Sequence, residues 1–138
     1  MTALTRYHPN GGTPDGPDWI WVFGSNLAGR HGAGAALVAK VRFGAAAGQG
    51  VGITGRSYAV PTKDRNLAVL PMQVIARHVV QFLDHAGAQP EKLFYITRVG
   101  CGLAGYRDSQ IAPMFALAPA NCSMPAQWTP YDRLAKST

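Results

Sequence analysis

The chain has 138 residues, of which 47% are hydrophobic and 14% charged, a balance that indicates one folded domain and excludes a disordered chain. Its formal net charge is +6, but the cations are scattered along the sequence, so nucleic-acid binding rests on net charge alone. Two distant cysteines exclude a disulfide framework. No apolar run reaches the ~20 residues of a membrane span and none marks a leader segment. We therefore expect a cytoplasmic protein without a membrane partner.

The first third of the chain predicts an arm, a strand and a helix. Residues 1–17 are rich in proline and glycine and predict an irregular N-terminal arm, which leaves residues 18–138 as a single domain. The apolar, aromatic and β-branched residues of 19–23 predict a buried strand. A glycine-rich loop follows it. The small side chains of residues 32–47 then predict a helix that packs closely on a sheet.

The middle of the chain contains the clearest helix. Residues 48–55 are glycine-rich and predict either a flexible connection or an edge strand with bulges. A second strand is expected at 57–60, ended by Pro61. Apolar residues recur on one face of residues 71–86, which predicts an amphipathic helix with Gly87 as its C-cap.

The last third predicts one more strand and one more helix. The apolar residues 93–99 predict a strand that runs into a second glycine-rich loop at 100–105. Ser109 is a candidate N-cap for a helix over residues 110–117. No further strand is evident beyond that helix, and the aromatic residues within 128–131 are candidates for an exposed aromatic tail.

Strands and helices thus alternate along the chain, and this order predicts an α/β fold whose central sheet is covered by helices on both faces. In open sheets of this class, ligands bind at the carboxyl ends of the strands. Both glycine-rich loops directly follow predicted strands. We therefore expect the two loops to form one binding site.

The first loop has the features of a phosphate-binding loop, because glycines let an anion approach the backbone and a helix begins just after them. Gly24 and Gly29 have the spacing of an ATPase P-loop, but Arg30 and His31 stand where that loop needs Lys and then Ser or Thr. Residues 32–34 begin a dinucleotide fingerprint that lacks its third glycine. The sequence predicts a phosphorylated ligand and matches neither nucleotide motif.

Three polar positions have both a functional and a structural interpretation. Asn26, next to Ser25, is a candidate for a ribose hydroxyl or a base edge, or else stabilises a tight turn. Lys63 is a candidate phosphate ligand or nucleophile, or else belongs to a solvated charged turn. Cys101 is a candidate nucleophile with His31 as its base, or else a small buried residue in a turn.

Metal and cofactor chemistry has little support in the sequence. His78 and His85 are seven positions apart and lack the i, i+4 spacing of a helical metal pair. The few acidic residues form no cluster. We expect neither a bound metal nor a cofactor.

Three segments together resemble the macrodomain family, which binds ADP-ribose and related metabolites. Residues 25–36 are similar to the family's first ribose and phosphate loop. Residues 98–105, with the sequence Arg-Val-Gly-Cys-Gly-Leu-Ala-Gly, resemble the second loop of the branch that removes ADP-ribose or acyl-ADP-ribose through a lysine. Residues 56–65 resemble the strand and turn that carry this lysine, onto which Lys63 falls.

The resemblance implies a three-layer α/β/α fold with a central mixed sheet, and a diphosphate held on the backbones of residues 29–34 and 100–105. It implies a catalytic role for Lys63, assisted by Asp108 or Asp64. The ligand-binding residues are expected to be Ser25, Asn26, Gly29, Arg30, His31, Gly32 and Gly34 in the first loop and Gly100, Cys101, Gly102, Leu103, Ala104, Gly105 and Tyr106 in and after the second.

One position departs from the family pattern. The lysine-dependent branch usually has Asp after Gly-Cys-Gly-Leu, and Ala104 occupies that place. We therefore expect binding of ADP-ribose or a related NAD-derived nucleotide, with hydrolysis of an ADP-ribose conjugate left open. The alternative is a non-enzymatic module of the same fold that binds nucleic acid or a protein partner, based on the net charge and the aromatic tail.

Overall fold

The structure, a computed structural model, describes residues 6–9 and 11–132 and has a mixed α/β fold, as the alternation of elements predicts. Its strands are β1 (Tyr7–His8), β2 (Trp19–Asn26), β3 (Gly52–Thr54), β4 (Ser57–Lys63), β5 (Leu93–Ile96) and β6 (Cys122–Pro125). Its helices are α1 (Gly34–Arg42), α2 (Met72–Gly87) and α3 (Asp108–Ile111), with 3-10 turns at η1 (Ala112–Phe115) and η2 (Ala126–Tyr131).

The six strands form one sheet in the order β1-β6-β5-β2-β4-β3. The first five in that order are parallel to their neighbours, and β3 runs antiparallel to β4 at one edge. The carboxyl ends of β2, β4 and β5 therefore meet at the same edge of the sheet. The loops that follow these strands are brought together there.

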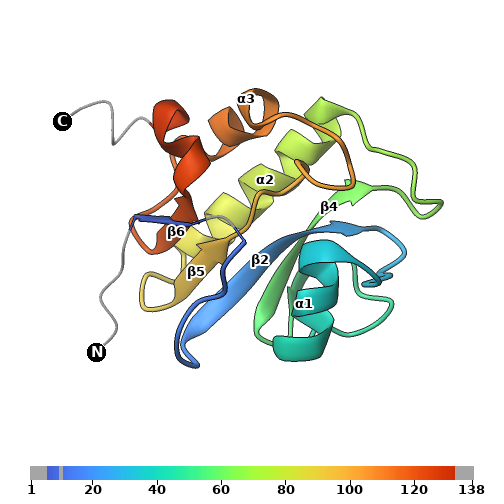
Figure 1. Ribbon diagram of the computed structural model, residues 1–138, viewed down its shortest axis with the longest axis horizontal. Helices are drawn as coiled ribbons and strands as arrows, with labels where there is room; N and C mark the ends of the chain where they lie inside the picture. The colour runs from blue at the N-terminus through green and yellow to red at the C-terminus, as the bar shows by residue number, and fades with distance from the viewer. Residues whose placement is uncertain (1–5, 10, 133–138) are drawn as a thin grey trace.

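Helices cover both faces of this sheet (Figure 1), and β2 is buried between two separate hydrophobic cores. Successive side chains of a strand point to opposite faces. Trp21 and Phe23 of β2 pack with α1, whereas Val22 packs with α2. Burial on both faces explains why residues 19–23 are apolar at every position instead of alternating.

Three strands are longer or shorter than the sequence predicts. The first continues past its expected end at residue 23 to Asn26, so Ser25 and Asn26 belong to β2 and do not follow it. The expected end of the second strand at Pro61 is wrong, because β4 continues to Lys63. Pro61 lies beyond Ala59, the last residue of β4 that pairs with β3, so its missing N–H costs no bond to that neighbour. The expected strand at 93–99 ends at Ile96, and the glycine-rich residues 48–55 include the edge strand β3.

The helices follow the expected positions but differ at their ends. α1 spans nine residues inside the predicted 32–47, and α2 closely matches the predicted amphipathic helix. Gly87 lies inside α2 instead of capping it, because Ala88 caps the helix in a right-handed conformation. Ser109 is likewise inside α3. The expected helix over residues 110–117 is wrong beyond Ile111, where α3 ends and the 3-10 turn η1 follows. The N-cap is Arg107, whose N–H donates to the side chain of Gln110 at 2.9 Å.

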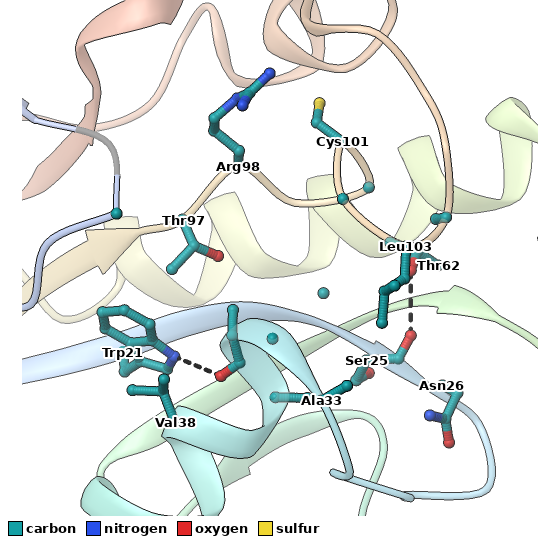
Figure 2. A pocket seen from close by; sticks show the side chains of 18 of the residues that line it. Trp21, Ser25, Asn26, Ala33, Val38, Thr62, Thr97, Arg98, Cys101 and Leu103 are labelled. Atoms are coloured by element: carbon teal, nitrogen blue, oxygen red, sulfur yellow. Dashed lines mark hydrogen bonds between the residues drawn. The ribbon is translucent and has the colours of Figure 1, made fainter.

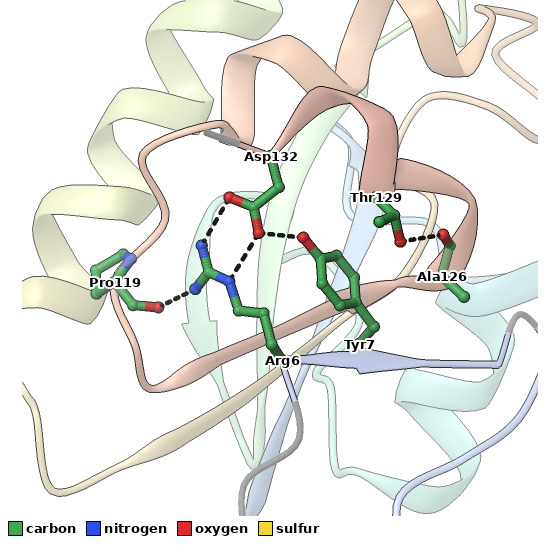
Figure 3. A network of polar contacts seen from close by, with 6 residues as sticks. All are labelled: Arg6, Tyr7, Pro119, Ala126, Thr129 and Asp132. Carbon is green, nitrogen blue, oxygen red and sulfur yellow. Dashed lines mark hydrogen bonds and ion pairs between the residues drawn. The ribbon is translucent and has the colours of Figure 1, made fainter. Parts of the chain in front are cut away.

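The two ends of the described chain lie side by side and extend the sheet. β1 belongs to the segment expected to be an irregular arm, but it pairs in parallel with β6, a strand that the sequence did not predict. Arg6 forms an ion pair with Asp132 and donates a hydrogen bond to the carbonyl of Pro119, while the hydroxyl of Tyr7 donates to Asp132 (Figure 3). The expected arm is therefore, in part, an edge of the sheet.

The expectation of an exposed aromatic tail is wrong at Trp128. Its side chain is 1% exposed and packs on Phe115 with 5.0 Å between ring centroids. None of the helices within residues 6–9 and 11–132 has the length and hydrophobicity that a membrane crossing requires.

Candidate functional site

A cleft of about 670 Å³ opens at the carboxyl ends of β2 and β4, between the start of α1 and the loop after β5 (Figure 2). Eleven residues predicted for the site line it. They are Ser25, Asn26, Arg30, Gly32, Gly34, Lys63, Gly100, Cys101, Gly102, Leu103 and Ala104. The remaining six do not line it. They are Gly29, His31, Asp64, Gly105, Tyr106 and Asp108. Both glycine-rich loops thus contribute to one cleft.

The start of α1 forms one wall of the cleft. The first N–H groups of a helix have no carbonyl partner within the helix, and the N-cap residue Ala33 makes no side-chain hydrogen bond to them. Gly34, Ala35 and Ala36, the first three residues of α1, all line the cleft. This wall therefore presents uncapped N–H groups and the positive end of the helix dipole, which together favour an anion.

The loop that leads into α1 is held by the side chains of Ser25 and Asn26. The Asn26 amide nitrogen donates to the carbonyl of Arg30 at 2.8 Å, and its oxygen accepts from the Arg30 N–H at 2.9 Å. The hydroxyl of Ser25 donates to the carbonyl of Gly50. These contacts give both side chains a structural role in shaping the loop beside the cleft.

Gly29 and His31 lie beneath the loop, outside the cleft. The backbone of Gly29 passes so close to that of Gly48 that a side chain at residue 29 would overlap it. The His31 ring is buried, with Nε2 3.0 Å from the carbonyl oxygen of Ala46 and its plane nearly perpendicular to the ring of Phe23. The loop that the sequence marks for phosphate therefore uses these two residues for its own packing.

The turn over residues 100–105 forms the opposite wall. Hydrogen bonds from the Tyr106 N–H to the carbonyl of Gly100 and from its hydroxyl to the carbonyl of Leu70 fix the base of the turn. Within the part of the chain that the structure describes, the N–H groups of Gly102, Leu103 and Ala104 make no hydrogen bond. These three residues line the cleft, so the second wall also has backbone donors without a partner in the described chain.

Asp108 is bound in a network behind the second wall. Arg98 donates to both carboxylate oxygens, at 2.9 and 2.7 Å, and the indole N–H of Trp128 donates to one of them at 2.8 Å. The hydrogen bond from Arg98 is the main cause that lowers the pKa of Asp108 below its ordinary value. In Figure 2 the side chains of Arg98 and Cys101 point away from the cleft. The carboxylate thus holds the loop in place from behind.

The sulfur of Cys101 is poorly suited to nucleophilic attack. Burial, with a smaller contribution from Asp108, raises the pKa of this thiol to about 12. The thiolate is the reactive form of cysteine, so a high pKa opposes its reaction at neutral pH. The structural interpretation of Cys101 as a turn residue is the one that the geometry favours.

Lys63 ends β4 and lines the cleft, and a tight turn follows it. One carboxylate oxygen of Asp64 accepts the N–H groups of Asn66 at 2.8 Å and Ala68 at 3.0 Å. These bonds commit the Asp64 carboxylate to the turn. Lys63 thus lines the cleft, whereas its expected carboxylate partners, Asp64 and Asp108, do not.

An aromatic surface lines another part of the cleft, and sequence reasoning missed it. The His8 ring stacks on Tyr95 at 3.7 Å between centroids, and Trp21 stacks on the same tyrosine at 5.5 Å. The indole N–H of Trp21 donates to the carbonyl of Ala35, which ties this surface to α1 (Figure 2). The three residues come from β1, β2 and β5, so only the strand order brings them together.

The charge of the lining is positive. Arg30 and Lys63 line the cleft, and no Asp or Glu is among the described lining residues. Arg98 also lines it, but its guanidinium is paired with Asp108 behind the wall. His8 also lines it, but burial lowers the pKa of this histidine to about 4, so it is neutral at pH 7. In the described residues, no three His, Cys, Asp or Glu side chains form a group that could hold a metal ion.

The comparisons with known proteins find no matching family model, no matching curated protein and no matching solved structure.

Proposed function

We propose that this protein binds ADP-ribose or a related NAD-derived nucleotide in the cleft between α1 and the 100–105 turn. The observation that carries the proposal is the pair of backbone N–H rows on opposite walls, one at the start of α1 and one at residues 102–104. A diphosphate has oxygens on both sides and can accept hydrogen bonds from both rows. Arg30 and Lys63 add positive charge at the same cleft.

The size and lining of the cleft also suit a nucleotide. A volume of about 670 Å³ is within the usual range for small-molecule sites. His8, Trp21 and Tyr95 are only 7%, 4% and 6% exposed and stack on one another, so what they offer a base is an apolar contact at the cleft wall and not an open ring face. The glycine-rich walls let the phosphates approach the backbone. Helices on both faces of a mixed sheet are consistent with the three-layer macrodomain arrangement that we propose for the fold.

The geometry supports binding more directly than hydrolysis. Lysine-dependent removal of ADP-ribose needs an acid or base beside the lysine. Asp108 is engaged by Arg98 and Trp128, Asp64 is engaged by its own turn, and Ala104 offers no such group. We therefore assign Lys63 the role of an electrostatic anchor for the ligand.

Calorimetric titration with ADP-ribose tests this proposal, with AMP and ribose 5-phosphate as partial ligands. The most informative variant is Ala33→Asp. A carboxylate at the N-cap stabilises the helix, but it also occupies the place proposed for the phosphate and repels a phosphate by its negative charge. We expect a thermal midpoint at or above that of the wild type and a loss of affinity of about tenfold or more.

Ala33→Asn is the matched control, since asparagine caps the helix without adding charge. We expect its loss of affinity to be clearly smaller than that of Ala33→Asp. Absence of heat with millimolar ADP-ribose would reject the proposal. Equal binding by Ala33→Asp and the wild type would reject the placement of the diphosphate at α1.

A further inference from the structure

Leu67 combines an unfavourable backbone with an exposed apolar side chain at the cleft. It is the one non-glycine residue with a positive φ in the described part of the chain, at 66°. Its side chain lines the cleft, and the residue is 42% exposed. The left-handed conformation is costly for a residue with a branched side chain and is far easier for Gly or Asn.

The turn around Leu67 does not itself call for leucine. The Asp64 carboxylate accepts the N–H groups of Asn66 and Ala68, and the Leu67 N–H donates to the carbonyl of Asp64 at 3.1 Å. All of these bonds use the backbone of residues 66–68, so glycine at residue 67 would keep them and relieve the strain. A strained residue at a cleft is a reason to look for a ligand that uses its side chain.

Leu103 presents a second exposed leucine to the same cleft. It is 73% exposed, lies between Gly102 and Ala104, and extends from the second wall toward the first loop (Figure 2). The small neighbours on either side leave it with little apolar cover from its own turn. Two leucines from different loops therefore leave apolar surface open at one cleft that also contains Lys63.

We propose that the ligand carries an uncharged alkyl substituent, and that Leu67 and Leu103 select it by covering it on two sides. This inference rests on the proposed function, because it places the substituent on the nucleotide that the glycine-rich walls bind. Burying alkyl carbons between the leucines removes their apolar surface and that of the leucines from water. A fully buried methylene group strengthens binding about fourfold.

The test compares two ligands that differ only in this group, ADP-ribose and its n-butyl glycoside at the anomeric carbon of the distal ribose. The readout is the ratio of their dissociation constants in calorimetry. We expect the butyl derivative to bind the wild type about tenfold more tightly, since its four carbons are only partly covered. In Leu67→Gly and Leu103→Ser, we expect this ratio to fall to about twofold or less.

Leu117→Ser is the matched control, because Leu117 is 71% exposed but does not line the cleft. We expect it to keep the wild-type ratio. Leu67→Gly tests the side chain without disturbing the fold, since glycine suits the left-handed backbone. We expect the thermal midpoint of this variant not to fall below that of the wild type.

The outcomes separate this inference from the proposed function. If neither ligand binds, the proposed function fails and the inference fails with it. If ADP-ribose binds and the butyl derivative binds equally or more weakly, the inference alone is overturned. It is also overturned if the preference for the butyl derivative is unchanged in both leucine variants.

Discussion

Gly29 illustrates how much of the first loop depends on a single residue. It adopts a φ of 70°, and a side chain there would overlap the backbone of Gly48 and Gln49. We expect Gly29→Ala to lower the free energy of unfolding by on the order of 3 kcal/mol, because backbone strain and overlap add together. Urea unfolding followed by tryptophan fluorescence measures the change.

Gly32→Ala is the control for this prediction, because Gly32 has no atom within 4 Å of an added Cβ and no positive φ. We expect its stability to stay within about 0.5 kcal/mol of the wild type. Similar losses of stability in both alanine variants would contradict the packing role of Gly29.

The roles of single residues in this loop were only partly predictable from the sequence. The strand, the glycines and the helix placed the loop at the cleft, and Arg30, Gly32 and Gly34 line it as expected. Gly29 and His31 contact residues 46–49 instead. That contact joins segments about fifteen or more positions apart, and no local periodicity reports it. Glycines needed for close backbone approach to a ligand and to another loop look the same in a sequence.

The element that fixes the second wall is α3, through Asp108. Because its pKa is lowered in the folded state, Asp108 contributes stability that is present above the ordinary pKa of an aspartate and is lost as the pH falls through the folded value. We expect Asp108→Asn to cost about 1–2 kcal/mol at pH 7, since the ion pair is partly exposed and partly screened. The difference from the wild type should shrink below about pH 4.

Urea unfolding at pH 7 and at pH 3 provides the measurement for this variant. Asp84→Asn serves as the control, because Asp84 is an exposed residue of α2. A stability difference for Asp108→Asn that is equally large at both pH values would show that the ionised carboxylate is not its source.

At the level of elements, the sequence predicted those with strong patterns and missed the short ones. α2 has sixteen residues and a clear apolar face, and its position was predicted closely. β1 has only two residues, too few for periodicity to register. β6 has four residues, as β5 does, but its sequence Cys-Ser-Met-Pro lacks the aromatic and β-branched residues of Leu-Phe-Tyr-Ile. Pro61 wrongly suggested the end of a strand, because the sequence cannot tell that the β3 edge has already ended at that point.

The architecture of the whole molecule determines how the cleft is closed at its aromatic side. The α/β alternation predicted a site at the carboxyl edge of the sheet, and the cleft lies there. The sequence could not predict that His8, Gly11, Gly12 and Thr13 would line it too. Their position follows from the pairing of β1 with β6, which joins the two ends of the described chain. Such long-range pairing leaves no mark on local sequence patterns.

The contacts of Arg6 hold this edge of the sheet in place and supply a last prediction. Its guanidinium contacts Asp132, which is 1% exposed, and the Pro119 carbonyl, while its own carbonyl accepts the N–H of Met124 at 2.8 Å. We expect Arg6→Ala to lower the free energy of unfolding by about 1–3 kcal/mol, because hydrogen bonds to a buried charge are lost. Amide exchange of Met124 should accelerate as β1 separates more often from β6. Arg65→Ala is the control, since Arg65 is exposed and outside the cleft lining.

If β1 completes the aromatic side of the cleft, Arg6→Ala should also weaken the binding of AMP more than that of ribose 5-phosphate. An equal loss of affinity for both ligands would show that β1 stabilises this edge of the sheet without shaping the part of the cleft that contacts the base.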